Sequence, residues 1–401
     1  MRILFLSPRQ CCPPQSGAKL REFYLAEALG HRAELTHVFF SPPDAAPLGP
    51  TDLPFAKRIL SVVQPRSYTP WRILRGVFSR WPLPVLNYTS EPMKVSLNTL
   101  VRDQKFDLIH LDSIHMAAYA PMLSRATGAP LVYDWHNIES EAMLRYSGHV
   151  QSTLRARYAA LTARRLASLE ERILRESFGH LVCSERERDE LVRRVPGARI
   201  AVIENGVDSR FYADTDGAAG ERRRIVFVGS MNYHANAEAA IFFARSIWPR
   251  ISRQFPQWVL TLVGSNPTTA VQALHGSGNV EVTGTVPDVR PYYMEAVAAI
   301  VPLRVGGGTR LKILEAMAAG VPVASTTLGA EGLAVSPGRN ILIADREDDW
   351  LTHLQALSRD ARMRDELVAA GRELVCARYD WQVLGKALFE TYSRWLEMSL
   401  R

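Results

Sequence analysis

The sequence predicts an α/β protein made of two doubly wound parallel-sheet domains. Its 401 residues exceed what one ordinary hydrophobic core holds. Short apolar runs also alternate with amphipathic stretches along the chain. Such alternation is typical of parallel strands that helices bury on both faces. Two successive sets of these runs therefore indicate two domains.

The expected strands follow one another in two groups. Those of the first domain lie within residues 2–8, 33–40, 106–112, 130–137, 179–185 and 199–206, and those of the second within residues 223–229, 258–264, 279–284, 298–303 and 321–326. Apolar periodicity stops in "ENGVDSRFYADTDGAAGERRR", which indicates a boundary. We therefore assign an N-terminal domain to residues 1–205 and a C-terminal domain to residues 206–379. The remainder, "DWQVLGKALFETYSRWLEMS", reads as a terminal helix with a broad apolar face.

Composition restricts the class of protein. With 47% hydrophobic and 22% charged residues the chain is a globular protein. The net charge of +7 fits either anionic partners or a solvated basic face. Four cysteines without a C-x-x-C pair disfavour a structural zinc and favour a reducing compartment. Because no run resembles a signal peptide or a membrane span, we expect a cytoplasmic protein, at most peripheral on the inner face of the cell membrane.

The stretch "VPLRVGGGTRLKILEAMAAGVPVAS" reads as a strand, a glycine-rich loop and a helix that ends at Gly320. Arg310 and Lys312 stand where positive charge opposes the helix dipole. A phosphate group would satisfy both cations, and free amides at the helix start would help to bind it. The order of glycines matches neither the dinucleotide fingerprint nor the P-loop. Glu315 needs a partner, which could be a ribose diol, Lys312 one turn earlier, or a nearby loop.

Five segments in order resemble the retaining glycosyltransferases of family 4, which have the GT-B fold. They are "VCSERERDEL", "VIENGVDSRFY", "RIVFVGSMNYHAN", "VEVTGTVPDVRPYY" and "GGGTRLKILEAMAAGVPVAS" followed by "GAEGL". The resemblance covers nearly the whole chain. It implies two facing Rossmann-like domains with an interdomain cleft, and a C-terminal helix, residues 380–401, that crosses back to complete the first domain.

The resemblance also implies roles for single residues. Glu315 matches the residue that holds the donor ribose, and His136 matches a histidine near the donor sugar and phosphate. Backbone groups of the donor site correspond to Gly17, Gly308, Thr309 and Arg310. Gly307 stands where the family has a second glutamate that touches the sugar. Thr285 and Val286 are candidates for the base pocket, and His110 and Asn205 for residues that orient the site. An ordinary structural role stays open for Gly17 and for His136.

The chain departs from the family pattern after the first strand of the second domain. The family commonly has an arginine and a lysine there, whereas this chain offers Ser230 and Asn236. We therefore expect Arg310 and Lys312 to supply the charge that neutralises the diphosphate. This requires Arg310 to belong to the loop or the first turn, because residues two apart do not share a helix face.

Residues 68–90, "YTPWRILRGVFSRWPLPVLNYTS", mix five aromatic side chains with Arg72, Arg75 and Arg80. Such a mixture suits contact with anionic lipid or a lipid-linked acceptor. It also suits a partly buried helix whose arginines reach solvent, and the sequence favours this packing interpretation.

The observations predict a glycosyltransferase without a cofactor, and the resemblance implies that it is retaining and metal-independent. It would transfer a sugar from a nucleoside diphosphate sugar to a glycan or lipid-linked acceptor, in surface or exopolysaccharide biosynthesis, and would not bind nucleic acid. Two alternatives stay open: a nucleotide-sugar epimerase of the same fold, and a catalytically inactive homologue that serves as a partner subunit. The sequence does not identify the sugar, the base or the acceptor, since these depend on a few contacts.

Overall fold

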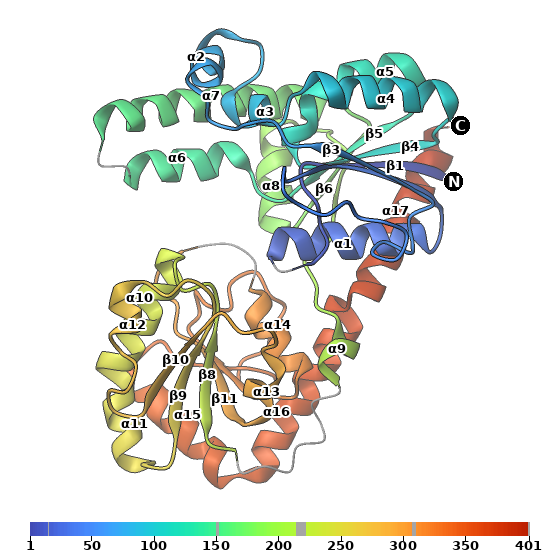
Figure 1. The fold of residues 1–401 in the computed structure, drawn as a ribbon. Coiled ribbons are helices and arrows are strands. Elements are labelled where there is room, and N and C mark those ends of the chain that lie inside the picture. Colours follow the sequence, from blue (N-terminus) through green and yellow to red (C-terminus); the bar gives the residue numbers. More distant parts are fainter. Residues whose placement is uncertain (15, 150–151, 214–221, 307–309, 400–401) are drawn as a thin grey trace. The chain divides into compact units, whose positions relative to one another are not determined.

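A computed structural model describes residues 1–14, 16–149, 152–213, 222–306 and 310–399. The chain forms two compact units. The first comprises Met1–Glu204 and the chain from Leu384 onward, and the second comprises Asn205–Val383. Each unit is a parallel sheet between helices, so the predicted fold class is confirmed (Figure 1).

The sheet of the first unit has seven parallel strands among the described residues, in the order β3-β2-β1-β4-β5-β6-β7. Their bounds are β1 Arg2–Ser7, β2 Glu34–Ser41, β3 Arg58–Val63, β4 Leu108–Asp112, β5 Leu131–Trp135, β6 Gly179–Val182 and β7 Ile200–Val202. In the central strands the apolar runs are buried on both faces; Ile3 to Leu6 of β1 are fully buried.

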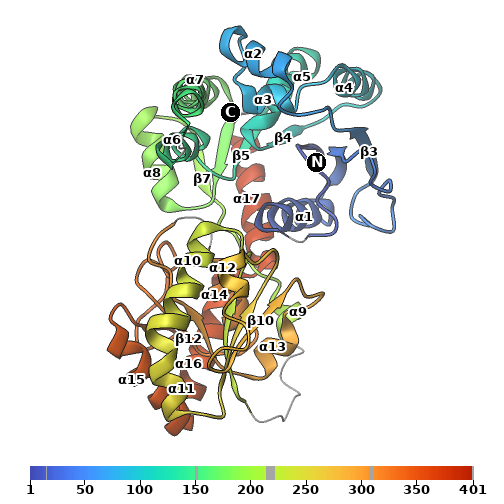
Figure 2. The same ribbon diagram turned by 60° about the vertical axis from the view of Figure 1, so that its left-hand side comes forward.

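Helices cover both faces of this sheet. Figure 2 shows α1 and α17 on one face and α3, α4 and α5 on the other. The bounds are α1 Gly17–Gly30, α2 Pro70–Phe78, α3 Leu83–Asn87, α4 Glu91–Asp103, η1 Ile114–Tyr119, α5 Ala120–Thr127, α6 Glu139–His149, α7 Thr153–Glu176, α8 Glu185–Arg194 and α17 Trp381–Ser399. Gly385 lets α17 approach α1, because a Cβ at this position would lie 2.2 Å from the Cβ of Ala28.

The sheet of the second unit has six parallel strands among the described residues, in the order β10-β9-β8-β11-β12-β13. Their bounds are β8 Arg224–Val228, β9 Val259–Val263, β10 Val280–Gly284, β11 Ala296–Val301, β12 Val323–Ser325 and β13 Leu342–Ile343. The helical elements are α9 Ser209–Ala213, α10 His234–Phe242, η2 Phe243–Ile247, α11 Trp248–Gln254, α12 Thr269–Gln272, α13 Arg290–Met294, α14 Leu311–Ala318, α15 Glu347–Arg359, α16 Ala361–Leu374 and η3 Val375–Tyr379.

Three features differ from the sequence prediction. Strand β3 was not expected, since it is an edge strand whose side chains are largely accessible. Strand β13 has two residues, too short for a recognisable pattern. The packing interpretation of residues 68–90 holds for Trp81 and Tyr88, which pack on the core, and is wrong for Trp71 and Phe78, which are 66% and 81% exposed.

Candidate functional site

In the second unit, chemically active residues gather at the carboxyl ends of β8 and β11. These neighbouring strands mark the switch point of the sheet, because β9 and β10 extend from β8 to one side and β12 and β13 from β11 to the other. Ligands of open α/β sheets bind at such points. Gly306, after β11, has φ +100, and a Cβ there would lie 2.7 Å from Ala235 Cβ on α10. The two loops therefore pack closely.

Lys312 connects these two loops. It lies in the first turn of α14, yet its ammonium donates to Asn236 Oδ1 of α10 at 2.6 Å. It also lies 4.6 Å from the ring centroid of Phe227 on β8. A Cβ on Gly229 would stand 3.0 Å from Lys312 Nζ, so the glycine leaves room for the ammonium beside the loop after β8. The ammonium of Lys312 thus lies beside the loop where the resemblance led us to expect an arginine and a lysine.

Burial makes Lys312 easy to deprotonate. It lowers the pKa of Lys312 to about 7, although the carboxylate of Glu315 acts in the opposite direction. An ammonium has three N–H donors, and Asn236 accepts one of them. An anion at this loop could accept another and would favour the charged form.

Arg310 points to a different loop. It is the N-cap residue of α14, in keeping with the expected place in the loop or first turn. Its Nη2 donates to Leu328 O at 2.8 Å, after β12, and lies 3.6 Å from Glu331 Oε2. The side chain is only 4% exposed. Arg310 and Lys312 therefore diverge: Arg310 bonds the loop after β12, whereas Lys312 lies beside the loop after β8. That at least one of them serves the diphosphate stays a prediction.

Glu315 is partly buried one turn after Lys312. Burial raises the pKa of Glu315 to about 7. The ion pair with Lys312 that the spacing allows is not formed, since the ammonium reaches Asn236 instead. No donor within the described part of the chain bonds the Glu315 carboxylate. A partly buried carboxyl group without a donor is suited to accept hydrogen bonds from the hydroxyl groups of a ligand.

The other predicted donor residues have varied positions. Gly307, Gly308 and Thr309 lie outside the described residues. Gly17 is the exposed first residue of α1. Thr285 is exposed just after β10, while Val286 packs on the core. Asn205 is buried at the start of the second unit.

In the first unit, His136 directly follows β5, beyond the end of the strand. Its Nε2 lies 2.9 Å from Asp112 Oδ1, at the end of β4. Burial by itself would raise the pKa of Asp112, but His136 and neighbouring hydrogen bonds hold this pKa well below its usual value. His136 is therefore oriented by a buried carboxylate that the sequence reasoning did not single out.

His110 lies in the core behind this pair. Its Nδ1 lies 2.5 Å from the Tyr392 hydroxyl of α17, and its ring stacks on Phe5 with centroids 4.0 Å apart. Its Nε2 is 4.0 Å from Asp112 Oδ1. His110 is thus linked to His136 through Asp112.

Two consecutive residues of α1, Arg21 and Glu22, reach the ends of strands. The sequence reasoning did not single out either of them. Arg21 donates to both carboxylate oxygens of Asp134, each at 2.7 Å, and to Ile203 O at 2.7 Å. Glu22 is fully buried near Asp112 and His136. The available signal was a charged pair inside the helix after the first strand, together with "LIHLD", whose acid ends a buried run.

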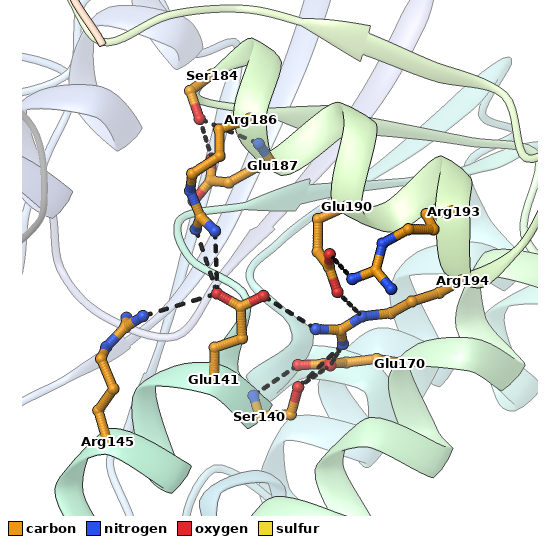
Figure 3. Close-up of polar contacts among 10 residues, drawn as sticks. All are labelled: Ser140, Glu141, Arg145, Glu170, Ser184, Arg186, Glu187, Glu190, Arg193 and Arg194. Carbon is orange, nitrogen blue, oxygen red and sulfur yellow. Dashed lines mark hydrogen bonds and ion pairs between the residues drawn. The ribbon is translucent and has the colours of Figure 1, made fainter. Parts of the chain in front are cut away.

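The segment after His136 is fixed by a polar network, which Figure 3 shows. Ser140 N and Oγ both donate to the buried Glu170 of α7, at 2.8 and 2.5 Å. Arg194 of α8 donates to Glu170 and to Glu141, at 2.9 and 3.0 Å. Because α6, α7 and α8 are tied together at this point, the loop that carries His136 has a rigid base.

Comparison with known proteins gives consistent matches. Residues 21–206 match a family model described as a glycosyl transferase 4-like domain, and residues 222–360 match one described as glycosyl transferases group 1. A glycogen synthase of Mycobacterium tuberculosis is 25% identical over 73% of this chain and 69% of its own length. A phosphatidyl-myo-inositol mannosyltransferase of Mycobacterium leprae is 24% identical over 72% of this chain and 74% of its own. The structure of Anabaena HepE in complex with UDP and glucose superposes with a TM-score of 0.65 at 18% identity, covering 98% of this chain and 99% of that one.

Proposed function

Since the chain belongs to the group 1 family of glycosyltransferases, we propose that it transfers a sugar from a nucleoside diphosphate sugar to a glycan or lipid-linked acceptor, with retention of configuration and without a metal ion. The observation that carries the proposal is the Lys312 ammonium held by Asn236 at the switch point of the second sheet. UDP is the first donor nucleotide to test, because HepE was crystallised with UDP.

The residues of this switch point fit a diphosphate leaving group. As the bond to the sugar breaks, negative charge grows on the phosphate oxygens. Lys312 offers a cation beside them, and the start of α14 offers a favourable dipole. Glu315 is available for the ribose hydroxyls, and His136 for the sugar or its phosphate. We assign no protein nucleophile, so the leaving phosphate assists the acceptor hydroxyl on the same face of the sugar.

The test begins with a thermal-shift screen of UDP-, GDP- and ADP-sugars. A donor at 100 times its Kd should stabilise the protein by about 2.7 kcal/mol. The best donor is then incubated alone and with lipid-linked and glycan acceptors, and the anomeric configuration of the product is read by NMR. Transfer with retention supports the proposal, and inversion contradicts it. Epimer or nucleotide released without acceptor would favour an epimerase; donor binding without turnover would favour an inactive partner subunit.

The lipid-linked acceptor class gains support from α2. Trp71, Leu74 and Phe78 recur on one helix face and are 66%, 51% and 81% exposed. The other side of α2 is held by α7, where Tyr158 donates to Ile73 O at 3.1 Å. Residues 53–90 contain no acidic residue but six basic ones, Lys57, Arg58, Arg66, Arg72, Arg75 and Arg80. This combination suits an anionic bilayer, so we assign α2 to peripheral membrane contact in a polysaccharide-assembly role. No helix within the described ranges has the length and apolarity to cross a bilayer.

Vesicle sedimentation tests this contact. The protein should bind vesicles that contain phosphatidylglycerol, bind less at high salt, and bind poorly to phosphatidylcholine alone. Replacing Trp71 and Phe78 together by serine should weaken binding more than tenfold, since each buried aromatic contributes about 1.5–3 kcal/mol. Val95→Ser on α4, where the valine is 63% exposed, is the matched control. Equal losses for both variants, or equal binding to both lipids, would exclude α2 as the contact.

A further inference from the structure

Glu22 of α1 is a buried carboxyl group to which the donor chemistry assigns no role. Its side chain is fully buried. Within the described part of the chain, neither Glu22 oxygen has a hydrogen-bond partner, and Asp112 Oδ2 also lacks one. Ligand atoms of Glu22, Asp112 and His136 all lie within 4.8 Å of one another. Two buried carboxyl groups therefore lie close to each other in the interior.

The charges around this pair indicate that the two carboxyl groups share a single proton. Arg9 Nε lies 2.8 Å from Glu22 Oε1, so one guanidinium faces the pair. Arg21 is bonded to Asp134. Two ionised carboxylates in contact would repel each other strongly in a dry interior. One shared proton leaves a single negative charge, which Arg9 balances.

The environment decides which acid keeps the proton. Burial raises the pKa of Glu22 well above its usual value, and the charge of Asp112 raises it further. Asp112 has the opposite tendency, because His136 stabilises its charged form. Other titratable groups also face the cluster. Burial raises the pKa of Cys11 after β1, of Tyr88 before α4 and of Glu139 at the start of α6, which favours their neutral forms.

We propose that Glu22 is a positioning residue that remains a neutral carboxylic acid near pH 7. Its O–H donates a hydrogen bond to Asp112 and so holds the carboxylate that orients His136. An ionised Asp112 can only accept, so His136 Nε2 carries a proton. Nδ1 of His136 is then the ring nitrogen left for the substrate. The proton stays between Glu22 and Asp112 and is not transferred in the reaction.

Infrared difference spectroscopy tests the protonation state without any turnover. The spectrum of the wild-type protein minus that of Glu22→Gln, at pH 7, should contain the carbonyl stretch of a protonated carboxylic acid. That band should persist in Lys312→Gln, which lies in the other unit. Carboxylate bands at this pH would overturn the proposal. So would Mn²⁺ binding that wild type shows and Glu22→Gln lacks, because Glu22 would then be a metal ligand.

Kinetics test the positioning role, which rests on the proposed function. Glutamine can donate an N–H in place of the acid, so Glu22→Gln should keep kcat for sugar transfer to the acceptor within about threefold of wild type. Glu22→Ala lacks the donor and should lower kcat at least about tenfold while the donor KM changes little. The fall of kcat at alkaline pH, where the acid ionises, should be absent in Glu22→Gln. Equal losses in both variants, with equal melting temperatures, would contradict positioning. If no variant or wild type turns over donor, the proposed function fails while the infrared result still decides the protonation of Glu22.

Discussion

Replacement of Lys312 by glutamine should selectively weaken binding of a nucleoside diphosphate. The ammonium already uses one donor on Asn236 at 2.6 Å and can offer another to a phosphate oxygen. A hydrogen bond to a charged group contributes about 1.5–3 kcal/mol, which corresponds to about 10- to 150-fold in Kd. Uridine lacks the phosphates, so its affinity should change little. The loss should therefore appear for UDP and not for uridine.

The effect should depend on pH with a definite sign. Because the pKa of Lys312 is about 7 without ligand, the ammonium is mostly charged at pH 6. At pH 8 only about one tenth of the side chains carry the proton, so binding must take up a proton and should be about tenfold weaker. The contribution of Lys312 is present below this pKa and is lost as the pH rises through it. Lys312→Arg keeps the charge and should remove this pH dependence.

Isothermal titration calorimetry at pH 6 and pH 8 provides the assay, in buffers of different ionisation enthalpy to count protons. The Lys312→Arg variant corrects for titration of UDP itself, and uridine corrects for titration of Glu315. Equal losses for UDP and uridine in Lys312→Gln would refute the reasoning, because the mutation would then only disturb the loop. Proton uptake that persists in Lys312→Arg would assign the titration to another group.

Three further predictions concern single side chains. Glu315→Gln should weaken binding of both uridine and UDP in calorimetry with little change in melting temperature; unchanged affinity would reject ribose binding, and collapse of the fold would indicate a structural role. His136→Ala should lower kcat more than it weakens UDP binding, because a contact that strengthens in the transition state affects turnover; a loss confined to KM would argue against it. Arg21→Met should destabilise the protein by about 3–5 kcal/mol in urea unfolding, since it leaves the buried Asp134 without its cation. The double variant Arg21→Met, Asp134→Leu should recover part of that loss, and no recovery would mean that the backbone contact to Ile203 dominates.

The sequence by itself was sufficient for the architecture. Buried parallel strands are continuous apolar runs, and helices between them have an amphipathic period, so both sheets could be predicted without contacts. The exceptions follow from the same physics. β3 lies at an edge with accessible side chains, and β13 spans two residues, so neither has a strong pattern. The sequence also indicated Lys312, Glu315 and His136, because polar groups at strand ends and helix starts are visible in one dimension.

Only the tertiary structure decided which of these groups meet. Arg310 and Lys312 are two residues apart, yet one reaches Leu328 and the other Asn236, because the direction of each side chain depends on how α14 begins. Asp112 lies 24 residues before His136 in the chain but within 2.9 Å of it, since β4 and β5 are neighbours in the sheet. Glu22 lies on a third element, α1, and its proposed neutral state depends on the burial that α1, β4 and β5 create together. Contacts between distant residues arise only in the folded chain, and the resulting pKa shifts arise from proximity and desolvation. No local sequence pattern contains this information.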